Sequence, residues 1–396
     1  MTKVYIIGAC RTPIGKMGGA LASVSAVELG SVVIKEALQR AKIPAEQVDH
    51  VYMGCVIQAG LGQNVARQAA IKAGLLHSTT AQTVNIVCGS GLDAVNSAAR
   101  MIQSGDADIV IAGGMESMSQ APFALKEARY GYRMGSPMID TPIIDTMVND
   151  ALWEAIYNYH MGITAENVAE KWGITRLELD AFAVASQDKA ITAITDGRFV
   201  DEIVPVVIKR RKGDTVVEAD EGPRLGTTVE TLAKLKPAFK PDGIVTAGNS
   251  SGINDGADAV VLVSEERVKE LCLEAQAEWV GGMLGGVDPS IMGVGPVEST
   301  TKLFKKLDIS IDDIDLIEAN EAFAAQSIAV KRELRIPEEK LNVNGGAIAL
   351  GHPVGASGCR ILVTLIHAMK QKRAKMGLAT LCIGGGMGCS TVIRRI

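Results

Sequence analysis

Short apolar runs alternate with helix-like stretches along both ends of this 396-residue chain. Residues 4–7 are strand-like, residues 25–41 follow a helical pattern and residues 48–54 form another strand-like run. Such alternation is typical of a layered α/β sheet. A chain of this length is expected to form two or three domains, or one large layered body. We therefore expect an α/β fold with substantial internal surface.

A segment of this pattern occurs twice. The helical pattern of residues 92–102 is followed by a strand-like run and by Gly113-Gly114-Met115. Near the C-terminus, a helical pattern at 359–369 is followed by the strand-like run 378–383 and by Gly385-Gly386-Met387. This indicates an internal duplication, although two glycine-rich α/β segments could also coincide by chance. Duplicated halves can assemble an active site between them.

The two copies differ in one loop. Ser90 follows Asn85 by five residues, whereas Ser357 follows Asn344 by 13. The eight additional residues in the second copy include Gly351-His352-Pro353. We therefore expect the halves to contribute different side chains to a shared site.

Residues 121–245 lack the regular alternation and are predicted to form an inserted domain. Residues 1–120 together with 246–270 would form one half, and residues 271–396 the other. Within the insertion, Lys209-Arg210-Arg211-Lys212 is typical of a solvated hairpin tip, the alternative being a ligand contact.

The composition is that of a soluble globular protein, with 47% hydrophobic and 21% charged residues. No apolar run approaches the roughly 18 residues that span a bilayer, so no membrane partner is expected. A formal net charge of -5 would repel nucleic acid, so an anionic ligand needs a local positive patch. The chain runs directly into its first strand and ends without a peroxisomal signal, so we expect a cytoplasmic protein.

Cys88 lies between an apolar run and the glycine-rich start of a helix, Gly89-Ser90-Gly91. Most free cysteines are buried packing residues. At the start of a helix, however, unpaired N–H groups and the helix dipole favour the thiolate form. The glycines also let the backbone approach a ligand, and its N–H groups could hold an oxyanion. Cys88 is therefore a candidate nucleophile.

Thiolate chemistry also needs a base. Of five histidines, only His352 lies in a glycine-rich loop, at the point of the repeat that matches the approach to Cys88. We expect His50 and His77 at the surface or in loops and His367 packed in an apolar helix. The sequence leaves His160 undecided.

A second cysteine, Cys382, ends a predicted strand and precedes the glycine-rich residues 384–388. The seven cysteines include no C-x-x-C pair, and no histidines cluster near them. We therefore expect neither a disulfide framework nor a metal site, and a reducing compartment fits best. Dinucleotide-binding, P-loop and zinc-protease motifs are also missing, which argues against a dehydrogenase or a kinase.

Four segments resemble the motif blocks of the thiolase family. They are, in chain order, Val84-Asn85-Ile86-Val87-Cys88-Gly89-Ser90-Gly91, Asn320-Glu321-Ala322-Phe323-Ala324, residues 345–353 and residues 382–388. The resemblance spans the whole chain. It implies the thiolase fold, in which duplicated α/β halves form a layered α-β-α-β-α body with an inserted loop domain that binds CoA.

The resemblance also implies a role for each candidate residue. Cys88 would accept an acyl group as a thioester after activation by His352. Asn320 would orient a water that, with His352, stabilises an enolate oxygen. The N–H groups of Cys88 and Gly384 would form a second oxyanion hole, and Cys382 would move the α-carbon proton. This chemistry needs no metal or redox cofactor.

His160-Met161-Gly162 resembles the short-chain branch of the family, where the pocket suits acetyl and acetoacetyl groups. Arg224 would contact the nucleotide end of CoA, the alternative being a surface salt bridge, and Thr231 stands where serine is common. The remaining CoA and substrate contacts that the resemblance implies are Leu152, Phe239, Ala247, Ser251, Ala322 and Phe323.

The implied reaction interconverts two acetyl-CoA with acetoacetyl-CoA plus CoA, in a homotetramer or dimer. The alternative in the same family is a broader 3-ketoacyl-CoA thiolase. Two alternatives come from other functional classes. The joint presence of Cys88, Asn320, His352 and Cys382 argues against a CoA-binding protein that has lost catalysis. The sequence also lacks the phosphate-binding motif expected of a nicotinamide oxidoreductase.

Overall fold

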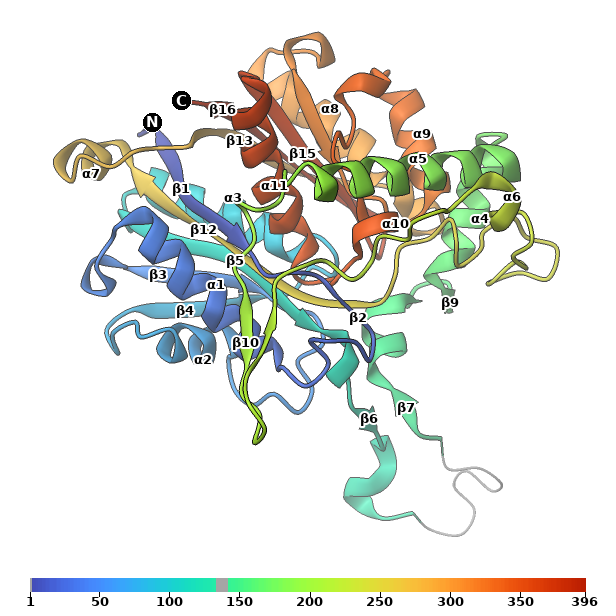
Figure 1. The fold of residues 1–396 in the computed structure, drawn as a ribbon, viewed down its shortest axis with the longest axis horizontal. Coiled ribbons are helices and arrows are strands. Elements are labelled where there is room, and N and C mark those ends of the chain that lie inside the picture. Colours follow the sequence, from blue (N-terminus) through green and yellow to red (C-terminus); the bar gives the residue numbers. More distant parts are fainter. Residues whose placement is uncertain (1, 133–141) are drawn as a thin grey trace.

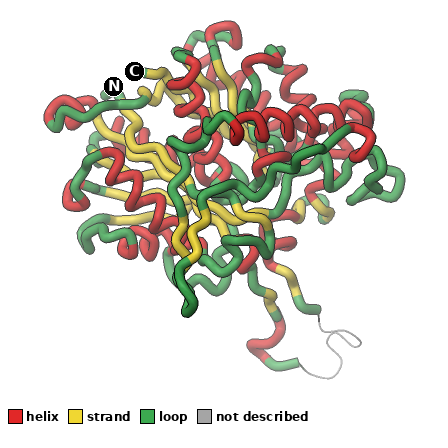
Figure 2. The backbone as a smooth tube through the Cα atoms, viewed as in Figure 1, coloured by secondary structure: helices red, strands yellow, loops and turns green. Residues whose placement is uncertain are grey.

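The computed structural model describes residues 2–132 and 142–396 (Figure 1). Strands occupy the middle of the body and helices flank them (Figure 2). The main sheet follows the path β14-β15-β16-β13-β1-β12-β5-β3-β4, and the short β2 (Gly15–Lys16) also pairs with β12. No helix in these two ranges combines the length and the apolar character needed to cross a bilayer.

The N-terminal half contributes five strands to this path. They are β1 (Val4–Arg11), β3 (His50–Gly54), β4 (Thr80–Val84), β5 (Ile109–Ser117) and β12 (Asn254–Ser264). β3 runs parallel to β4 and β5, whereas β12 runs antiparallel to β5 and β1. β5 and β12 are buried along their whole length, as expected for strands covered on both faces.

The C-terminal half contributes the other four strands. They are β13 (Ala277–Gly286), β14 (Leu316–Ala319), β15 (Met376–Ile383) and β16 (Met387–Arg395). β14 and β15 are parallel, and β16 is antiparallel to β15 and β13. The halves join where Val4 to Ile6 of β1 pair with Ala277 to Trp279 of β13.

Helices form the layers outside and between the two halves. α3 (Ser90–Ser104) and α11 (Ser357–Lys372) contact each other and strands of both halves, so they form the central layer. α1 (Ala26–Ala41) and α2 (Val65–Lys72) cover the N-terminal strands, and α8 (Gly295–Leu307) covers the C-terminal strands. The predicted layered α/β fold is thus confirmed.

The helices begin and end close to where the sequence pattern places them. Ser25 caps α1 and forms a capping box with Glu28, a feature that stabilises a helix by about 1 kcal/mol. Gly105 ends α3 in the left-handed conformation. The remaining shorter helices are α7 (Glu265–Glu270), α9 (Ala324–Glu333) and α10 (Ala347–Leu350).

The insertion carries helices and short hairpins of its own. They are β6 (Phe123–Ala124), β7 (Ile144–Asp145), β8 (Trp153–Glu154), β9 (Tyr159–His160), α4 (Met161–Lys171), α5 (Arg176–Thr195), β10 (Val206–Ile208), β11 (Thr215–Val217) and α6 (Val229–Leu232). β6 and β7 project from the body, and the exposed basic run 209–212 lies between β10 and β11, at the predicted hairpin tip (Figure 1). The exact domain boundaries stay a prediction, and residues 133–141 of the insertion lie outside the described part of the chain.

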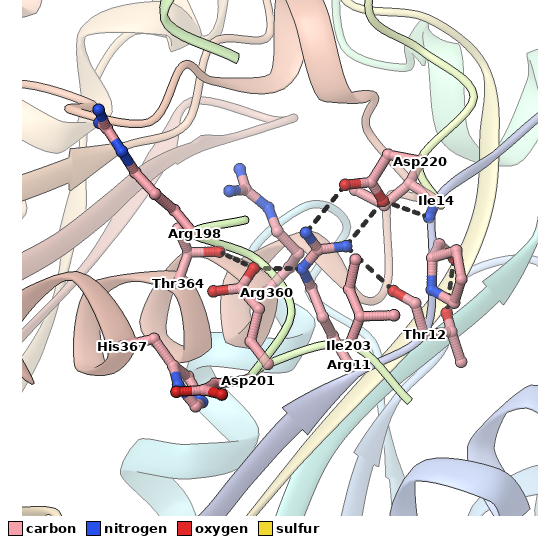
Figure 3. A network of polar contacts seen from close by, with 12 residues as sticks. Arg11, Thr12, Ile14, Arg198, Asp201, Ile203, Asp220, Arg360, Thr364 and His367 are labelled. Atoms are coloured by element: carbon pink, nitrogen blue, oxygen red, sulfur yellow. Dashed lines mark hydrogen bonds and ion pairs between the residues drawn. The ribbon is translucent and has the colours of Figure 1, made fainter. Parts of the chain in front are cut away.

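A buried ionic cluster connects the insertion to both halves (Figure 3). Arg11, at the end of β1, donates to both carboxylate oxygens of Asp220 at 2.7 and 2.9 Å and to Glu202 at 2.5 Å. The Thr364 hydroxyl of α11 donates to Glu202 at 3.1 Å. Removing one partner of a buried ion pair costs about 3–5 kcal/mol because the other charge is left unpaired, so all three segments must be in place for the cluster to be satisfied.

One expectation about the histidines is wrong. His50 begins β3 and is buried, with Nδ1 at 2.6 Å from the Thr80 hydroxyl of β4. The strand pairing that buries it comes from residues 30 positions away, which the local sequence does not reveal. His77 is exposed, and His367 is buried in α11, as expected.

Candidate active site

A cavity of about 480 Å³ opens where the two halves and the insertion meet. It is lined mainly by apolar surface, with a few convergent polar groups, as small-molecule sites usually are. The sequence-predicted residues that line it are Cys88, Leu152, His160, Met161, Arg224, Phe239, Ala247, Ser251, Ala322, Phe323, His352 and Gly384. Asn320, Thr231 and Cys382 are not among the lining residues in the described part of the chain.

Cys88 sits in a strained turn between β4 and α3. Val87 has a φ of 54°, in the left-handed region that β-branched residues rarely adopt. Such strain costs on the order of 1–3 kcal/mol and persists only where the surroundings enforce it. The Ser90 hydroxyl does so here, because it donates to the Val87 carbonyl at 2.6 Å and accepts from the Ile86 N–H at 3.0 Å. The local sequence does not reveal this strain.

The surroundings of Cys88 favour the neutral thiol over the thiolate. Burial raises its pKa to about 11, hydrogen bonds from the N–H groups of Gly384 and of Cys88 itself lower it in part, and the Glu116 charge raises it further. The expectation that the helix start favours the thiolate is therefore wrong for the resting state, because burial raises the pKa more than the N–H hydrogen bonds lower it. The two N–H groups directed at the sulfur fit an oxyanion hole for a carbonyl bound there.

His352 is held as a neutral imidazole. Burial, assisted by the Arg360 charge, lowers its pKa to about 4. The Ser357 hydroxyl donates to the Pro353 carbonyl at 2.9 Å and lies 2.5 Å from His352 Nδ1. Because the single hydroxyl hydrogen is used on Pro353, Nδ1 carries the ring proton and donates to Ser357. Nε2 is then free to accept a proton, as a general base requires.

Asn320 follows β14 and is buried beside His352, with Nδ2 3.5 Å from Nε2. Its Oδ1 has no hydrogen-bond partner among the described residues. An unpartnered buried acceptor of this kind suits a bound water or substrate group.

Cys382 is the penultimate residue of β15 and is fully buried. Burial raises its pKa, and the neighbouring Cys88 raises it further. The two thiols therefore lie close enough to influence each other, although only Cys88 lines the cavity.

A buried carboxylate that the sequence analysis did not single out supports the His352 loop. Glu321 accepts from the Ser186 hydroxyl at 2.6 Å, from Asn342 Nδ2 at 2.8 Å and from the Ile348 N–H at 3.2 Å. Its partners lie up to 135 residues away along the chain. Only its position directly after Asn320 could have drawn attention to it.

Aromatic rings and methionine narrow one part of the cavity. The His160 ring stacks on Phe239 with centroids 4.7 Å apart, and Phe323 meets Phe239 edge-on at 6.0 Å. A Cβ atom on Gly162 would lie 2.2 Å from the Phe239 ring, so only glycine allows this packing. His160 and Phe239 line the cavity together with Met161.

The cavity mouth carries the local positive charge that an anionic ligand needs. Arg224 is exposed and lines the cavity, and no ion pair between described residues involves it. Lys16, which the sequence analysis did not consider, also lines the cavity. Thr231 instead uses its hydroxyl within α6, donating to the Thr228 carbonyl at 2.8 Å.

No group of three or more His, Cys, Asp or Glu side chains is placed to hold a metal ion in the described ranges. The groups that can react here are the Cys88 thiol and the His352 imidazole on the cavity wall, the Asn320 amide beside His352, and the backbone N–H groups near Cys88. This set can perform covalent acyl transfer with general-base assistance.

Comparison with known proteins gives matches over nearly the whole chain. The family "Thiolase, N-terminal domain" matches residues 4–266, and "Thiolase, C-terminal domain" matches residues 273–395. The acetyl-CoA acetyltransferase of Syntrophomonas wolfei is 57% identical over 396 residues, covering 100% of this chain and 99% of the relative. That of Pseudomonas aeruginosa is 55% identical, with 100% of both chains covered. The crystal structure of the Bacillus anthracis acetyl-CoA acetyltransferase matches with a TM-score of 0.97 at 46% identity, covering 100% of this chain and 99% of that one.

Proposed function

Since this chain belongs to the thiolase family, we propose that it is an acetyl-CoA C-acetyltransferase, which interconverts two acetyl-CoA with acetoacetyl-CoA plus CoA. Relatives of more than 50% identity over their full length carry that name. The observation that carries the proposal is the convergence of Cys88, His352 and Gly384 on one cavity. The enzyme is an acyltransferase that works through an acetyl-Cys88 intermediate.

The first half-reaction transfers the acetyl group to the enzyme. His352 Nε2 takes the proton of the Cys88 thiol, and the sulfur attacks the thioester carbonyl of acetyl-CoA. The N–H groups of Cys88 and Gly384 stabilise the negative oxygen that forms. The carbon–sulfur bond to CoA then breaks, and the CoA sulfur leaves with the proton from His352. Acetyl-Cys88 and free CoA result.

The second half-reaction forms the carbon–carbon bond. His352 Nε2 takes the proton of the Cys382 thiol, and the resulting thiolate, a strong base because burial raises its pKa, removes a proton from the α-carbon of a second acetyl-CoA. His352 later returns its proton to the departing Cys88 sulfur. His352 and a water oriented by Asn320 stabilise the enolate oxygen. The α-carbon attacks the acetyl-Cys88 carbonyl, and the Cys88 sulfur leaves. Acetoacetyl-CoA is released, and the reverse sequence is thiolysis.

The CoA moiety extends from this centre toward the insertion. Arg224 meets its nucleotide end, and Leu152, Phe239, Ala247 and Ser251 line its path. Thr231 is the weakest of the CoA contacts we propose, because it is not a lining residue. His160, Met161, Ala322 and Phe323 surround the acyl end, which favours short acyl groups over the longer substrates of a broader 3-ketoacyl-CoA thiolase.

No metal or redox cofactor takes part in this scheme, and the partners are CoA thioesters rather than nucleic acid or membrane. We also propose a homotetramer in the cytoplasm. The projection formed by β6 and β7 supports the oligomer, because Phe123, Tyr130 and Ile143 expose 67%, 81% and 64% of their surface there. Large apolar side chains of this kind usually mark a protein contact.

The test is to supply acetyl-CoA alone. We expect released CoA, acetoacetyl-CoA and a Cys88 peptide that carries an acetyl group, detected by mass spectrometry. Failure to form the acetyl-Cys88 peptide would contradict the mechanism. Comparing the cleavage of acetoacetyl-CoA with that of a long-chain 3-ketoacyl-CoA decides between the two chain-length alternatives, since equal efficiency would favour the broader enzyme.

A further inference from the structure

Glu116 is a buried carboxylate that the mechanism above does not use. It lies near the end of β5, has no exposed surface and does not line the cavity. Its Oε2 accepts from the N–H groups of Val56 at 3.0 Å and Gly355 at 2.9 Å, and its Oε1 accepts from Ile57 at 3.1 Å. The Cys55 sulfur lies 3.7 Å from Oε1. The Glu116 side chain thus links the segment after β3 to Gly355, which lies 239 residues after Glu116 in the chain.

Gly355 is the third residue after His352, so this contact fixes the end of the His352 loop. The fit leaves no space: a Cβ atom on Gly355 would lie 2.6 Å from the Glu116 carboxylate. From the other side, a Cβ on Gly54 or Gly114 would come within 2.5 or 2.3 Å of the Gly355 carbonyl oxygen. The loop end is therefore inserted between the ends of β3 and β5, in the opposite half of the molecule.

The surroundings of Glu116 match an ionised carboxylate. Three N–H groups and one thiol donate to it, so a protonated carboxyl would direct its own hydrogen toward donors. Burial raises the pKa of Glu116 to about 7, and its hydrogen bonds oppose that rise. The titratable side chains that face it are the thiols of Cys55 and Cys88, and its charge raises the pKa of both.

We propose that Glu116 is a positioning residue for His352: it ties the His352 loop to the N-terminal half, so that the imidazole is held opposite Cys88. The inference rests on the proposed acyl transfer. It assigns Glu116 two opposing effects, since the side chain aligns the base while its charge disfavours the Cys88 thiolate. These effects can be separated by experiment.

The test is Glu116→Gln, which keeps the shape but removes the charge and directs an NH₂ group toward N–H donors. We expect kcat for acetoacetyl-CoA thiolysis to fall about 10–100-fold with KM changed by less than about threefold, because a misplacement of about 1 Å costs that much. Alkylation of Cys88 by iodoacetamide, followed against pH, should shift to lower pH. General loss of structure would also expose Cys88 and lower its pKa, so the thermal unfolding temperature of E116Q is measured in parallel and should stay close to that of the wild type.

Glu116→Asp separates the effect of the charge from the effect of the side-chain length. It keeps the charge but is one CH₂ shorter, so kcat should fall while the alkylation profile stays at the wild-type pH. Should E116Q fail to fold, E116D carries the kcat test. The matched control is Asp49→Asn, which alters a carboxylate that accepts two backbone N–H groups at the other end of β5 and should leave both readouts unchanged.

A wild-type kcat in folded E116Q would overturn the inference. If E116Q does not fold, a wild-type kcat in E116D would overturn it. It would also be overturned if kcat of D49N fell as far as kcat of the tested Glu116 variant. An alkylation profile of E116Q that does not move would overturn it as well. A wild-type protein without thiolysis would instead refute the proposed function, and the alkylation experiment would still report on the effect of the Glu116 charge on Cys88.

Discussion

The Cys88 turn and the His352 loop occupy the same place in the two halves but are built differently. In the N-terminal half, the hydroxyl of Ser90 at the start of α3 is used on the backbone of its own turn. In the C-terminal half, the hydroxyl of Ser357 at the start of α11 contacts the His352 ring. Eight additional residues convert a self-contained turn into a loop that supplies a base. The duplicated halves thus share one backbone arrangement, and the short insertion lets the C-terminal half supply the base for the nucleophile of the N-terminal half.

The two halves keep the same hydrogen bonds at the strand ends that lie away from the cavity. Asp49 precedes β3 and accepts the N–H groups of Asp108 and Ile109 at 2.8 and 3.0 Å. Asp315 precedes β14 and accepts those of Lys375 and Met376 at 2.7 and 3.0 Å. The halves therefore diverge at the strand ends that face the cavity and keep the same bonds at the opposite ends.

The largest effect is expected where the halves differ in chemistry. Cys88→Ala should lower acyl transfer by about 10⁴-fold or more, because no other group can supply the covalent intermediate. His352→Gln keeps the thiol and should leave slow acetylation of Cys88 measurable by mass spectrometry. Near-normal turnover of C88A would refute the assignment of the nucleophile.

Ser90 and Ser357 occupy equivalent positions, and replacing each one tests whether its hydroxyl serves folding or catalysis. Ser357→Ala should lower kcat about 10–100-fold, because His352 Nδ1 loses the acceptor that orients the ring. Ser90→Ala should instead lower the free energy of unfolding by about 1–3 kcal/mol, since the Ile86 N–H is left without a partner. Steady-state kinetics and urea unfolding of both variants provide the comparison. A larger loss of kcat in S90A than in S357A would contradict the assignment of a catalytic role to Ser357 and a structural role to Ser90.

Acid stability should depend on His352. Its pKa is about 4 in the folded protein, against about 6.5 in an unfolded chain. As the pH falls below 6.5, the unfolded chain binds a proton that the folded protein does not, so stability is lost progressively down to pH 4, by about 3 kcal/mol in total. The free energy of unfolding, measured at pH 7 and pH 4.5, should therefore fall less in His352→Gln than in the wild type. An equal fall in both would contradict the buried neutral imidazole.

The smallest effects are expected where the halves agree. Asp49→Ala and Asp315→Ala should each lower the free energy of unfolding by about 1 kcal/mol, since each removes two exposed hydrogen bonds to backbone N–H groups. Both should keep wild-type kcat. Thermal unfolding and thiolysis assays on the two variants check this, and a kcat loss in only one of them would show that the resemblance is superficial.

The sequence predicts the regular elements well because their signals are local. The periodicity of residues 92–102 and 359–369 places α3 and α11 within three residues of their observed ends. The glycine-rich strand ends likewise identify Cys88 and His352, which share the cavity. Both kinds of signal are contained in fewer than 20 consecutive residues.

What the sequence does not predict comes from distant partners. The contacts of Glu116 with Gly355 and of Glu321 with Ser186 join segments more than 100 residues apart. The protonation state of Cys88 was wrongly predicted for a related reason: the helix start is visible in the local sequence, but the burial that dominates the Cys88 pKa is not. The left-handed Val87 is likewise enforced by its surroundings, since no local preference of valine favours it.

The position of β1 in the sheet has a consequence for biosynthesis. This strand is made first, yet its hydrogen-bonded neighbours are β12 and β13, which begin at Asn254 and Ala277. At about 5–20 residues per second, the ribosome needs on the order of 12–50 s to deliver the first of these neighbours. Throughout that interval an apolar strand stays unpaired at both edges in the nascent chain. Chaperone capture during translation should therefore be strongest before residue 254 emerges and should decline once β12 has closed over β1.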